Sequence, residues 1–129
     1  KPGLYVNSKN YSFKTNDSVL VSTLKRLQMK HPNIFSDTSK YCYNDFTFSR
    51  ENEFYSTLYL KSIKTRIYYC FVFKKSSLRF FQIIDKNGNR YRLNDELNDE
   101  ESEKYIQDFE TSILPLLEKE LGMKAEFQD

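Results

Sequence analysis

The chain has 129 residues and a mass of 15.5 kDa, which suits one domain, and we expect a single α+β domain over residues 1–129. Its 39% of hydrophobic residues, its 11 Phe and 10 Tyr, and its net charge of only +2 exclude an intrinsically disordered protein. No apolar run approaches the roughly 18 residues of a membrane-spanning helix, so we expect no membrane span.

A short helix is predicted over residues 18–30. Residues 16–18, Asn-Asp-Ser, mark its start. Their short polar side chains can accept a hydrogen bond from an unpaired N–H of the first helical turn. Leucines then recur at the spacing of one helix face, at Leu20, Leu24 and Leu27. Pro32 ends the helix, because the residue before a proline is pushed out of the α region.

The middle of the chain, residues 44–93, predicts an antiparallel meander of four or more strands. Residues 54–60 alternate between the two faces of a strand. Residues 66–73 are apolar on both faces, as a central strand covered on both sides would be. Residues 78–84 form the next strand, after a turn at residues 74–77.

The last hairpin of this meander has the strongest turn signal in the sequence. Asn87 and Gly88 lie between two strand-like runs, and this pair is typical of a two-residue turn in which both residues have positive φ. Such a turn pairs Ile84 with Tyr91. We also expect Phe80 and Ile84 to lie together in the core.

A long helix is predicted over residues 99–121. Residues 98–103 place carboxylates at its start, where the helix dipole favours negative charge. Apolar side chains then follow one stripe, at Tyr105, Phe109, Ile113 and Leu117. Pro115 predicts a kink because it removes a helical hydrogen bond, and Gly122 predicts a left-handed end. The expected fold is therefore α+β, an antiparallel meander packed against a long C-terminal helix, with one shorter helix preceding the meander.

Charge is distributed unevenly along the chain. Residues 61–92 carry nine Lys and Arg residues and only one acidic residue, Asp85, which is a net charge of +8. Residues 93–129 carry three basic and 12 acidic residues, a net charge of −9. A basic, aromatic pair of hairpins is thus followed by an acidic helix. The pattern is purely structural if the helix neutralises the hairpins internally, or if these charges only protect the solvated edges of the sheet.

The favoured function is a non-catalytic domain that binds a protein partner. Tyrosines on one strand face would form the docking surface, and arginines of the basic hairpins would flank it. The candidate binding residues are Tyr55, Tyr59, Tyr68, Arg66, Arg79 and Arg92. No motif in the sequence identifies the partner.

Two other functions remain open. A curved sheet around one long helix can enclose an apolar pocket, as in the cystatin-like and nuclear-transport-factor-like cones, so a small apolar ligand is the first alternative. Single-stranded nucleic acid is the second, because the basic residues of 61–92 could contact phosphates while aromatic rings stack on bases. A sequence pI near 8.5 and the lack of a ribonucleoprotein signature make nucleic acid the weaker alternative.

Nothing in the sequence predicts an enzyme, a cofactor or a metal site. The only histidine, His31, follows the helix at 18–30, where a positive charge suits the helix dipole. Cys42 and Cys70 belong to no zinc-binding pattern, and we expect both to be reduced thiols. The loop at residues 85–89 lacks the bidentate glutamate of a calcium loop.

Overall fold

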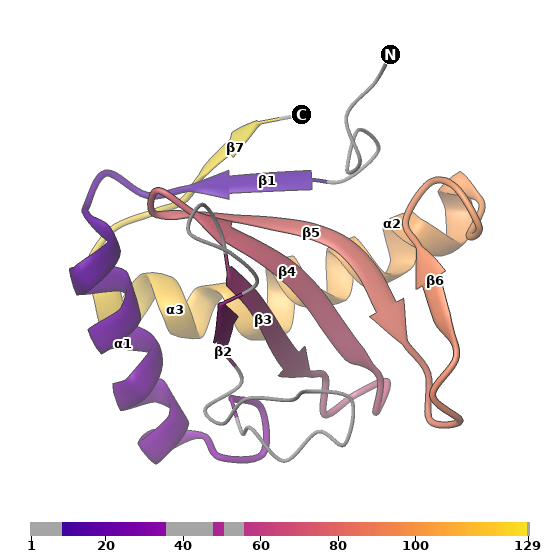
Figure 1. Ribbon diagram of the computed structural model, residues 1–129, viewed down its shortest axis with the longest axis horizontal. Helices are drawn as coiled ribbons and strands as arrows, with labels where there is room; N and C mark the ends of the chain where they lie inside the picture. Colours follow the sequence, from indigo (N-terminus) through magenta and orange to yellow (C-terminus); the bar gives the residue numbers. More distant parts are fainter. Residues whose placement is uncertain (1–8, 36–47, 51–55, 129) are drawn as a thin grey trace.

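The computed structural model describes residues 9–35, 48–50 and 56–128 and confirms the α+β class, with an antiparallel sheet, a short N-terminal helix and a longer C-terminal helix (Figure 1). Helix α1 (Asp17–Lys30) lies at one end of the sheet, and the C-terminal helix runs behind the sheet in this view. The C-terminal helix consists of α2 (Asp99–Asp108), a π-helical turn (Phe109–Ile113) and α3 (Leu114–Leu121). Within the described residues, no helix is long and apolar enough to cross a bilayer.

The sheet joins strands from both ends of the described chain. The strands are β1 (Lys9–Ser12), β2 (Phe48–Arg50), β3 (Ser56–Lys61), β4 (Tyr68–Lys74), β5 (Ser77–Ile84), β6 (Arg90–Arg92) and β7 (Glu126–Gln128). Their hydrogen-bonded order is β2-β3-β4-β5-β1-β7, and β6 also pairs with β5. All of these pairs are antiparallel. The first strand therefore lies between β5 and the last strand, a pairing that local sequence patterns do not predict.

The helices begin and end at the residues that the sequence indicates. Before α1, Asn16 Oδ1 accepts a hydrogen bond from the Val19 N–H at 2.9 Å. Before α2, Asn98 and Glu101 form a capping box, in which each side chain accepts a backbone N–H of the other residue. Gly122 ends α3 with a φ of 75°, a left-handed conformation that glycine adopts without strain.

The tight two-residue turn of the sheet lies between β4 and β5 and not at the Asn-Gly pair. Lys75 and Ser76 both have positive φ, at 49° and 58°, as a type I′ turn requires. In the β5–β6 hairpin only Gly88 has positive φ, at 87°. The prediction that Asn87 and Gly88 both adopt positive φ is therefore wrong.

The predicted pairing of Ile84 with Tyr91 is wrong by one residue, because Ile84 pairs with Arg90. The cause is Asp85, whose Oδ1 accepts two backbone N–H groups of the loop at 2.9 Å each. The Asp85 N–H also donates to the Asn89 carbonyl at 2.9 Å, which closes a three-residue loop. A three-residue hairpin loop needs only one residue of positive φ, and glycine supplies it.

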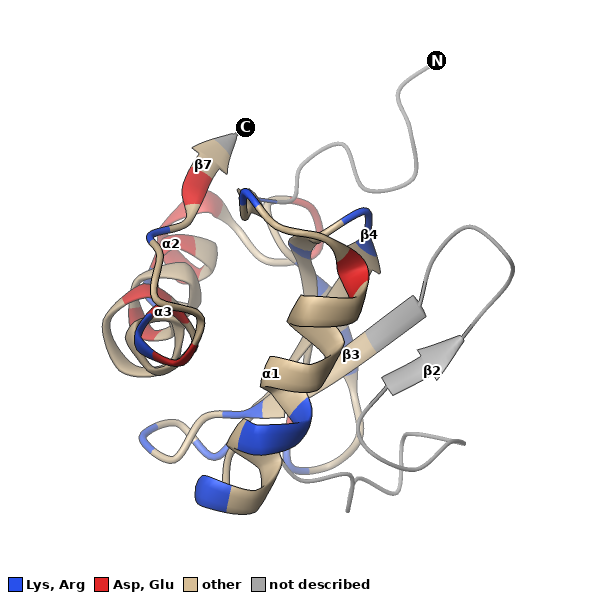
Figure 2. Cartoon of the chain, turned by 90° about the vertical axis from the view of Figure 1, so that its left-hand side faces the viewer, with Lys and Arg blue, Asp and Glu red and all other residues tan. Residues whose placement is uncertain are grey.

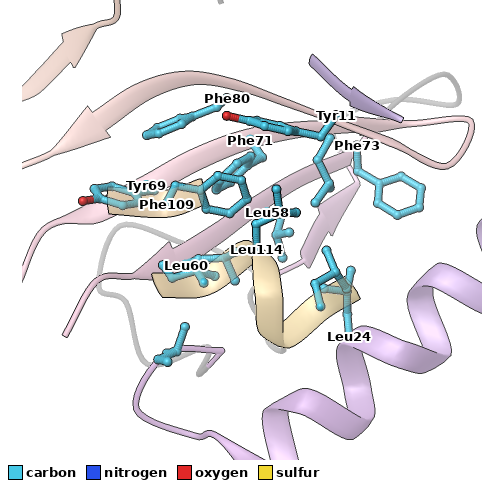
Figure 3. Close-up of a cluster of buried hydrophobic side chains, with 14 of the residues drawn as sticks. Tyr11, Leu24, Leu58, Leu60, Tyr69, Phe71, Phe73, Phe80, Phe109 and Leu114 are labelled. Atoms are coloured by element: carbon cyan, nitrogen blue, oxygen red, sulfur yellow. The ribbon is translucent and has the colours of Figure 1, made fainter. Parts of the chain in front are cut away.

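The core lies between the sheet and the C-terminal helix, with aromatic rings at its centre (Figure 3). The Phe109 ring centroid is 4.8 Å from that of Phe71 and 5.0 Å from that of Tyr11. The Phe80 ring lies 4.8 Å from Phe71 and 5.8 Å from Phe109. All four rings are fully buried, so they contribute to the hydrophobic stabilisation that ties the helix to the sheet.

A bulge in β5 reverses the side on which its last residues lie. The β4–β5 register shifts between Cys70 and Phe71. As a result, Phe80 faces the core as predicted, whereas Ile84 is buried on the opposite side of the sheet. There Ile84 forms a cluster with Tyr59 and Cys70. The prediction that Ile84 belongs to the helix-covered core is therefore wrong, because one extra residue inverts the alternation of a strand.

The C-terminal helix passes Pro115 through a wide π-helical turn. The Leu114 N–H donates to the Phe109 carbonyl, five residues back. The wider turn precedes the proline, which cannot donate a helical hydrogen bond of its own. Three consecutive residues of the helix, Asp108, Phe109 and Glu110, then all contact the sheet. A regular α-helix turns 100° per residue and presents consecutive residues to different sides.

Candidate functional site

The sheet has an inner face, which is covered by α2 and α3, and an opposite side that we call the outer face. Two rows of paired residues cross strands β3 to β6 on the outer face. One row is formed by Tyr59, Cys70, Gln82 and Arg92. The other is formed by Lys61, Tyr68, Ile84 and Arg90. Because side chains alternate along a strand, Val72, Lys74 and Arg79 lie on the same face.

Every lysine and arginine of strands β3 to β6 lies on the outer face. These five residues are Lys61, Lys74, Arg79, Arg90 and Arg92. The inner face is packed with apolar side chains, so a charged residue of these strands has to face outward. Burial explains why charged side chains lie on the outer face, but it does not explain why all of them are positive. None of these four strands contains Asp or Glu. The outer face is therefore basic by composition as well as by orientation.

The carboxylates of the C-terminal helix do not neutralise the outer face. Among the described residues, their ion pairs are with four cations outside residues 61–92, at N–O distances of 2.9 to 3.8 Å: Lys9, Arg26, Lys30 and Lys124. Figure 2 shows Asp and Glu gathered on α2, α3 and β7. Within the part of the chain that the structure describes, no ion pair therefore joins the acidic helix to the hairpins, although Lys64 of the β3–β4 loop lines one cleft together with Glu100 and Glu103.

The predicted tyrosines lie on the outer face as covered or partly covered rings. Tyr59 is only 8% exposed and packs against Cys70. Tyr68 is half-buried, and Lys61 Nζ lies 5.7 Å from the centroid of its ring. Tyr55 lies outside the described residues. The two described rings are therefore not open platforms, although they share one surface.

The three predicted arginines occupy different places. Arg92 is exposed on the outer face, in the same row as Tyr59. Arg79 is half-buried on that face, paired with Val72 of β4. Arg66 is exposed in the β3–β4 loop, where its φ of 60° is left-handed, so it is not part of the strand surface.

Lys61, Lys74 and Arg90 were missed as members of the outer face. Alternation was a usable signal for two of them, because Lys61 lies two residues after Tyr59 and Arg90 lies two residues before Arg92. Neither relation depends on the register between strands, because residues two apart in one strand share a face.

A second candidate site is a buried polar cluster on the inner face. Asp108 Oδ2 accepts hydrogen bonds from the hydroxyls of Tyr69 and Ser62, both at 2.6 Å, and Oδ1 accepts one from Ser112 at 3.2 Å. Asp108 is 6% exposed, while Tyr69 and Ser62 are fully buried. Burial raises the pKa of Tyr69 above its ordinary value, and the hydrogen bond to Asp108 raises it further. Tyr69 is therefore a stable donor at neutral pH and not a general base.

Glu110 forms a second tether on the other side of Phe109. The Tyr11 hydroxyl donates to Glu110 Oε2 at 2.8 Å, and Lys9 Nζ lies 3.1 Å from the same oxygen. Burial raises the pKa of Tyr11, with the Glu110 hydrogen bond as the next cause. With Asp108, this pair fixes the π-helical turn to the sheet at two points. No sequence motif marked these residues, because the π-helical turn brings them together.

A polar cleft of about 540 Å³ opens between α2 and the β3–β4 loop. Its walls carry Lys64 and Thr65 from the loop and charged or polar side chains of α2, including Asp108. This cleft does not lie between the sheet and the helix, where the sequence suggested a pocket for a small apolar ligand. In addition, the space between the sheet and the helix around Phe109 is filled by packed rings.

The inner cluster has the character of a structural anchor. Within the described residues, no buried side-chain nitrogen or oxygen lacks a hydrogen-bond partner. Nor does any group of three or more His, Cys, Asp or Glu in that part of the chain suit a metal ion. Comparisons with protein-family models, with curated proteins and with solved structures give no match.

Proposed function

We propose that the protein is a non-catalytic binding domain that docks an acidic surface of a protein partner on the outer face of its sheet. The observation that carries the proposal is the single sign of charge on strands β3 to β6, whose five charged side chains are all basic and all outward. The chain's own acidic helix lies on the other side of the sheet and takes its ion-pair partners elsewhere.

Four of these side chains, Lys61, Lys74, Arg90 and Arg92, make no ion pair within the described residues. Lys61 lies near the ring of Tyr68, at 5.7 Å from its centroid. A carboxylate of a partner would meet Arg90 and Arg92 without first breaking an ion pair of the described residues, and the field of the whole face would speed the encounter. Each exposed pair contributes only about 0.2–1 kcal/mol, so binding through several pairs should be modest and strongly dependent on salt.

The rings of the outer face favour a protein over a single-stranded nucleic acid. Binding of single strands relies on aromatic faces on which successive bases stack. Tyr59 is buried, and Tyr68 is half-buried with Lys61 near its ring, so neither offers an open face. Basic groups set around partly covered rings match a folded surface that brings carboxylates to the rim.

The test is a titration of a fluorescently labelled oligoglutamate peptide, followed by anisotropy, with an oligothymidine of equal charge as a second probe. We expect the peptide to bind at low salt and to lose about tenfold in affinity or more as ionic strength rises toward 0.5 M. We expect the double variant R90E/R92E to lose the binding, because both exposed guanidinium groups are reversed. Circular dichroism checks that the variant is folded.

The matched control is K119E/K124E, which changes the net charge equally but lies at the end of the C-terminal helix. This control should retain the binding. An equal loss in the control would contradict the outer face as the binding surface. Tighter binding of the oligothymidine would contradict a protein partner, and no binding of either probe at low salt would contradict the whole proposal.

A further inference from the structure

We propose that the acidic partner is a second copy of this chain, whose exposed carboxylates at the start of α2 dock on the outer face. This inference rests on the proposed function and names its partner. It joins two surfaces of one chain that lie on opposite sides of the sheet, carry opposite charge and are not used against each other within the molecule.

The acidic surface is formed by the first two turns of α2. Asp99, Glu100, Glu101 and Glu103 are all exposed, and within the described residues none of them makes an ion pair. Glu101 is partly engaged, because its Oε1 accepts the Asn98 N–H of the capping box. The other three carboxylates make no hydrogen bond within the described residues and are available to a cation.

The two surfaces are opposite in sign and similar in charge. The outer face carries five basic side chains of strands β3 to β6 and the start of α2 carries four exposed carboxylates, while the whole chain has a net charge of only +2. Two copies therefore repel each other weakly as whole molecules, yet the outer face of one and the acidic helix of the other attract.

The positions of the two surfaces set the symmetry of the assembly. In a two-fold dimer residue i of one copy contacts residue j of the other and j contacts i, so both surfaces would have to lie in one patch, whereas here they lie on opposite sides of the sheet. Contact between an outer face and an acidic helix is therefore head-to-tail, and an open assembly keeps one unused outer face at one end and one unused acidic helix at the other. We therefore expect chains or rings whose length grows with protein concentration, and not a closed dimer.

The experiment uses two neutralised variants of the full chain in sedimentation velocity. R90Q/R92Q removes charge from the outer face, and E100Q/E103Q removes charge from α2 without touching the capping box. The native chain should form species larger than 15.5 kDa at low salt and return to the monomer at high salt. Each variant alone should remain a monomer.

An equimolar mixture of the two variants gives the decisive result. The intact outer face of E100Q/E103Q can bind the intact helix of R90Q/R92Q, and neither copy can then add another, so we expect a complex of twice the mass of one chain and no larger species. The control variant K119Q/K124Q should assemble like the native chain.

Two outcomes would overturn the inference, and they are distinguishable from failure of the proposed function. In the first outcome, the native chain stays monomeric at low salt but still binds the oligoglutamate peptide through Arg90 and Arg92. The outer face then binds a partner other than a second copy of the chain. A mixture of the two variants that stays monomeric while the native chain assembles rules out the head-to-tail contact. If the peptide does not bind either, the proposed function fails as well.

Discussion

The two faces of the sheet use their polar side chains in opposite ways. On the inner face, Asp108 and Glu110 are satisfied by hydroxyl groups of the sheet, and the rings around Phe109 fill the remaining space. On the outer face, Arg90 and Arg92 are exposed and make no ion pair within the described residues. The inner face therefore stabilises the fold, whereas the outer face combines a buried cluster of Tyr59, Cys70 and Ile84 with exposed arginines on β6.

This difference separates stability from binding in a way that substitutions can test. Changes on the inner face should unfold the protein, and changes of exposed residues on the outer face should leave its free energy of unfolding within about 0.5 kcal/mol. A cluster of perturbed tyrosines and carboxylates often marks an active site. Here the same features accompany filled hydrogen bonds and a packed core, which marks an anchor.

Phe109→Ala should give the largest loss of stability. The ring is fully buried against Phe71, Tyr11 and Phe80, so its removal leaves a cavity and costs about 3–5 kcal/mol. Urea unfolding measures this loss. Arg92→Ala is the control from the outer face, and an equal loss there would remove the distinction between the two faces.

Asp108→Ala should cost about 3 kcal/mol, because it leaves the buried hydroxyls of Tyr69 and Ser62 without their acceptor. Asp108→Asn retains one acceptor oxygen and should cost less. Chemical denaturation of Asp108→Ala, Tyr69→Phe and the double variant forms a thermodynamic cycle. We expect the double variant to be less destabilised than the sum of the single ones, whereas strict additivity would show that the hydrogen bond is not a tether.

Alkaline pH should weaken the inner face. The pKa values of Tyr11 and Tyr69 are raised in the folded protein, so their contribution is fully present below the ordinary tyrosine pKa of 10.0. It is lost as pH rises above 10.0 toward the folded values, because the unfolded chain releases these protons first. Tyr69→Phe should cost about 1 kcal/mol at pH 7 and flatten this alkaline loss. Thermal unfolding between pH 8 and about 11 measures it, and an unchanged slope in the variant would contradict the assignment.

The smallest effect is expected at the β4–β5 turn. Lys75 has a φ of 49°, which asparagine tolerates better than lysine, so Lys75→Asn should stabilise the protein by about 0.5 kcal/mol. Lys86→Asn makes the same change of charge in the neighbouring hairpin, where residue 86 does not have positive φ, and should have no such benefit. If both variants shifted the midpoint of urea unfolding equally, the gain in stability would come from the change of charge and not from the backbone conformation of residue 75.

Much of this fold is predictable from local patterns. The α+β class, both helices and the glycine end of α3 follow from side-chain periodicity, from Asn16 and Asn98 before the helices, and from Gly122. The register of the β5–β6 hairpin is not predictable in this way. The Asp85 carboxylate stabilises a three-residue loop, which is longer than the two-residue turn that the Asn-Gly pair suggests. Local sequence also gives no sign of the pairing of β1 with β7, which joins segments far apart in the chain.

The location of the candidate site was predictable from the sequence, but the exposure of its side chains was not. The excess of basic residues at 61–92 pointed to the hairpins that carry the outer face, and alternation placed Tyr59 and Tyr68 on one face. It could not show that Tyr59 is buried, because the covering of a strand depends on the rest of the fold. The Asp108 tether was out of reach for a similar reason, since its partners Ser62 and Tyr69 lie far from it in the sequence.

The central claim is that the outer face is the binding surface. Titration of the ¹⁵N-labelled protein with an oligoglutamate peptide at low salt tests it most directly, because amide shifts locate the contact residue by residue. We predict that the perturbed amides lie on β3, β4, β5 and β6, with the largest shifts near Arg90 and Arg92. Shifts concentrated on α2 and α3, or an absence of shifts at peptide concentrations well above that of the protein, would contradict the account.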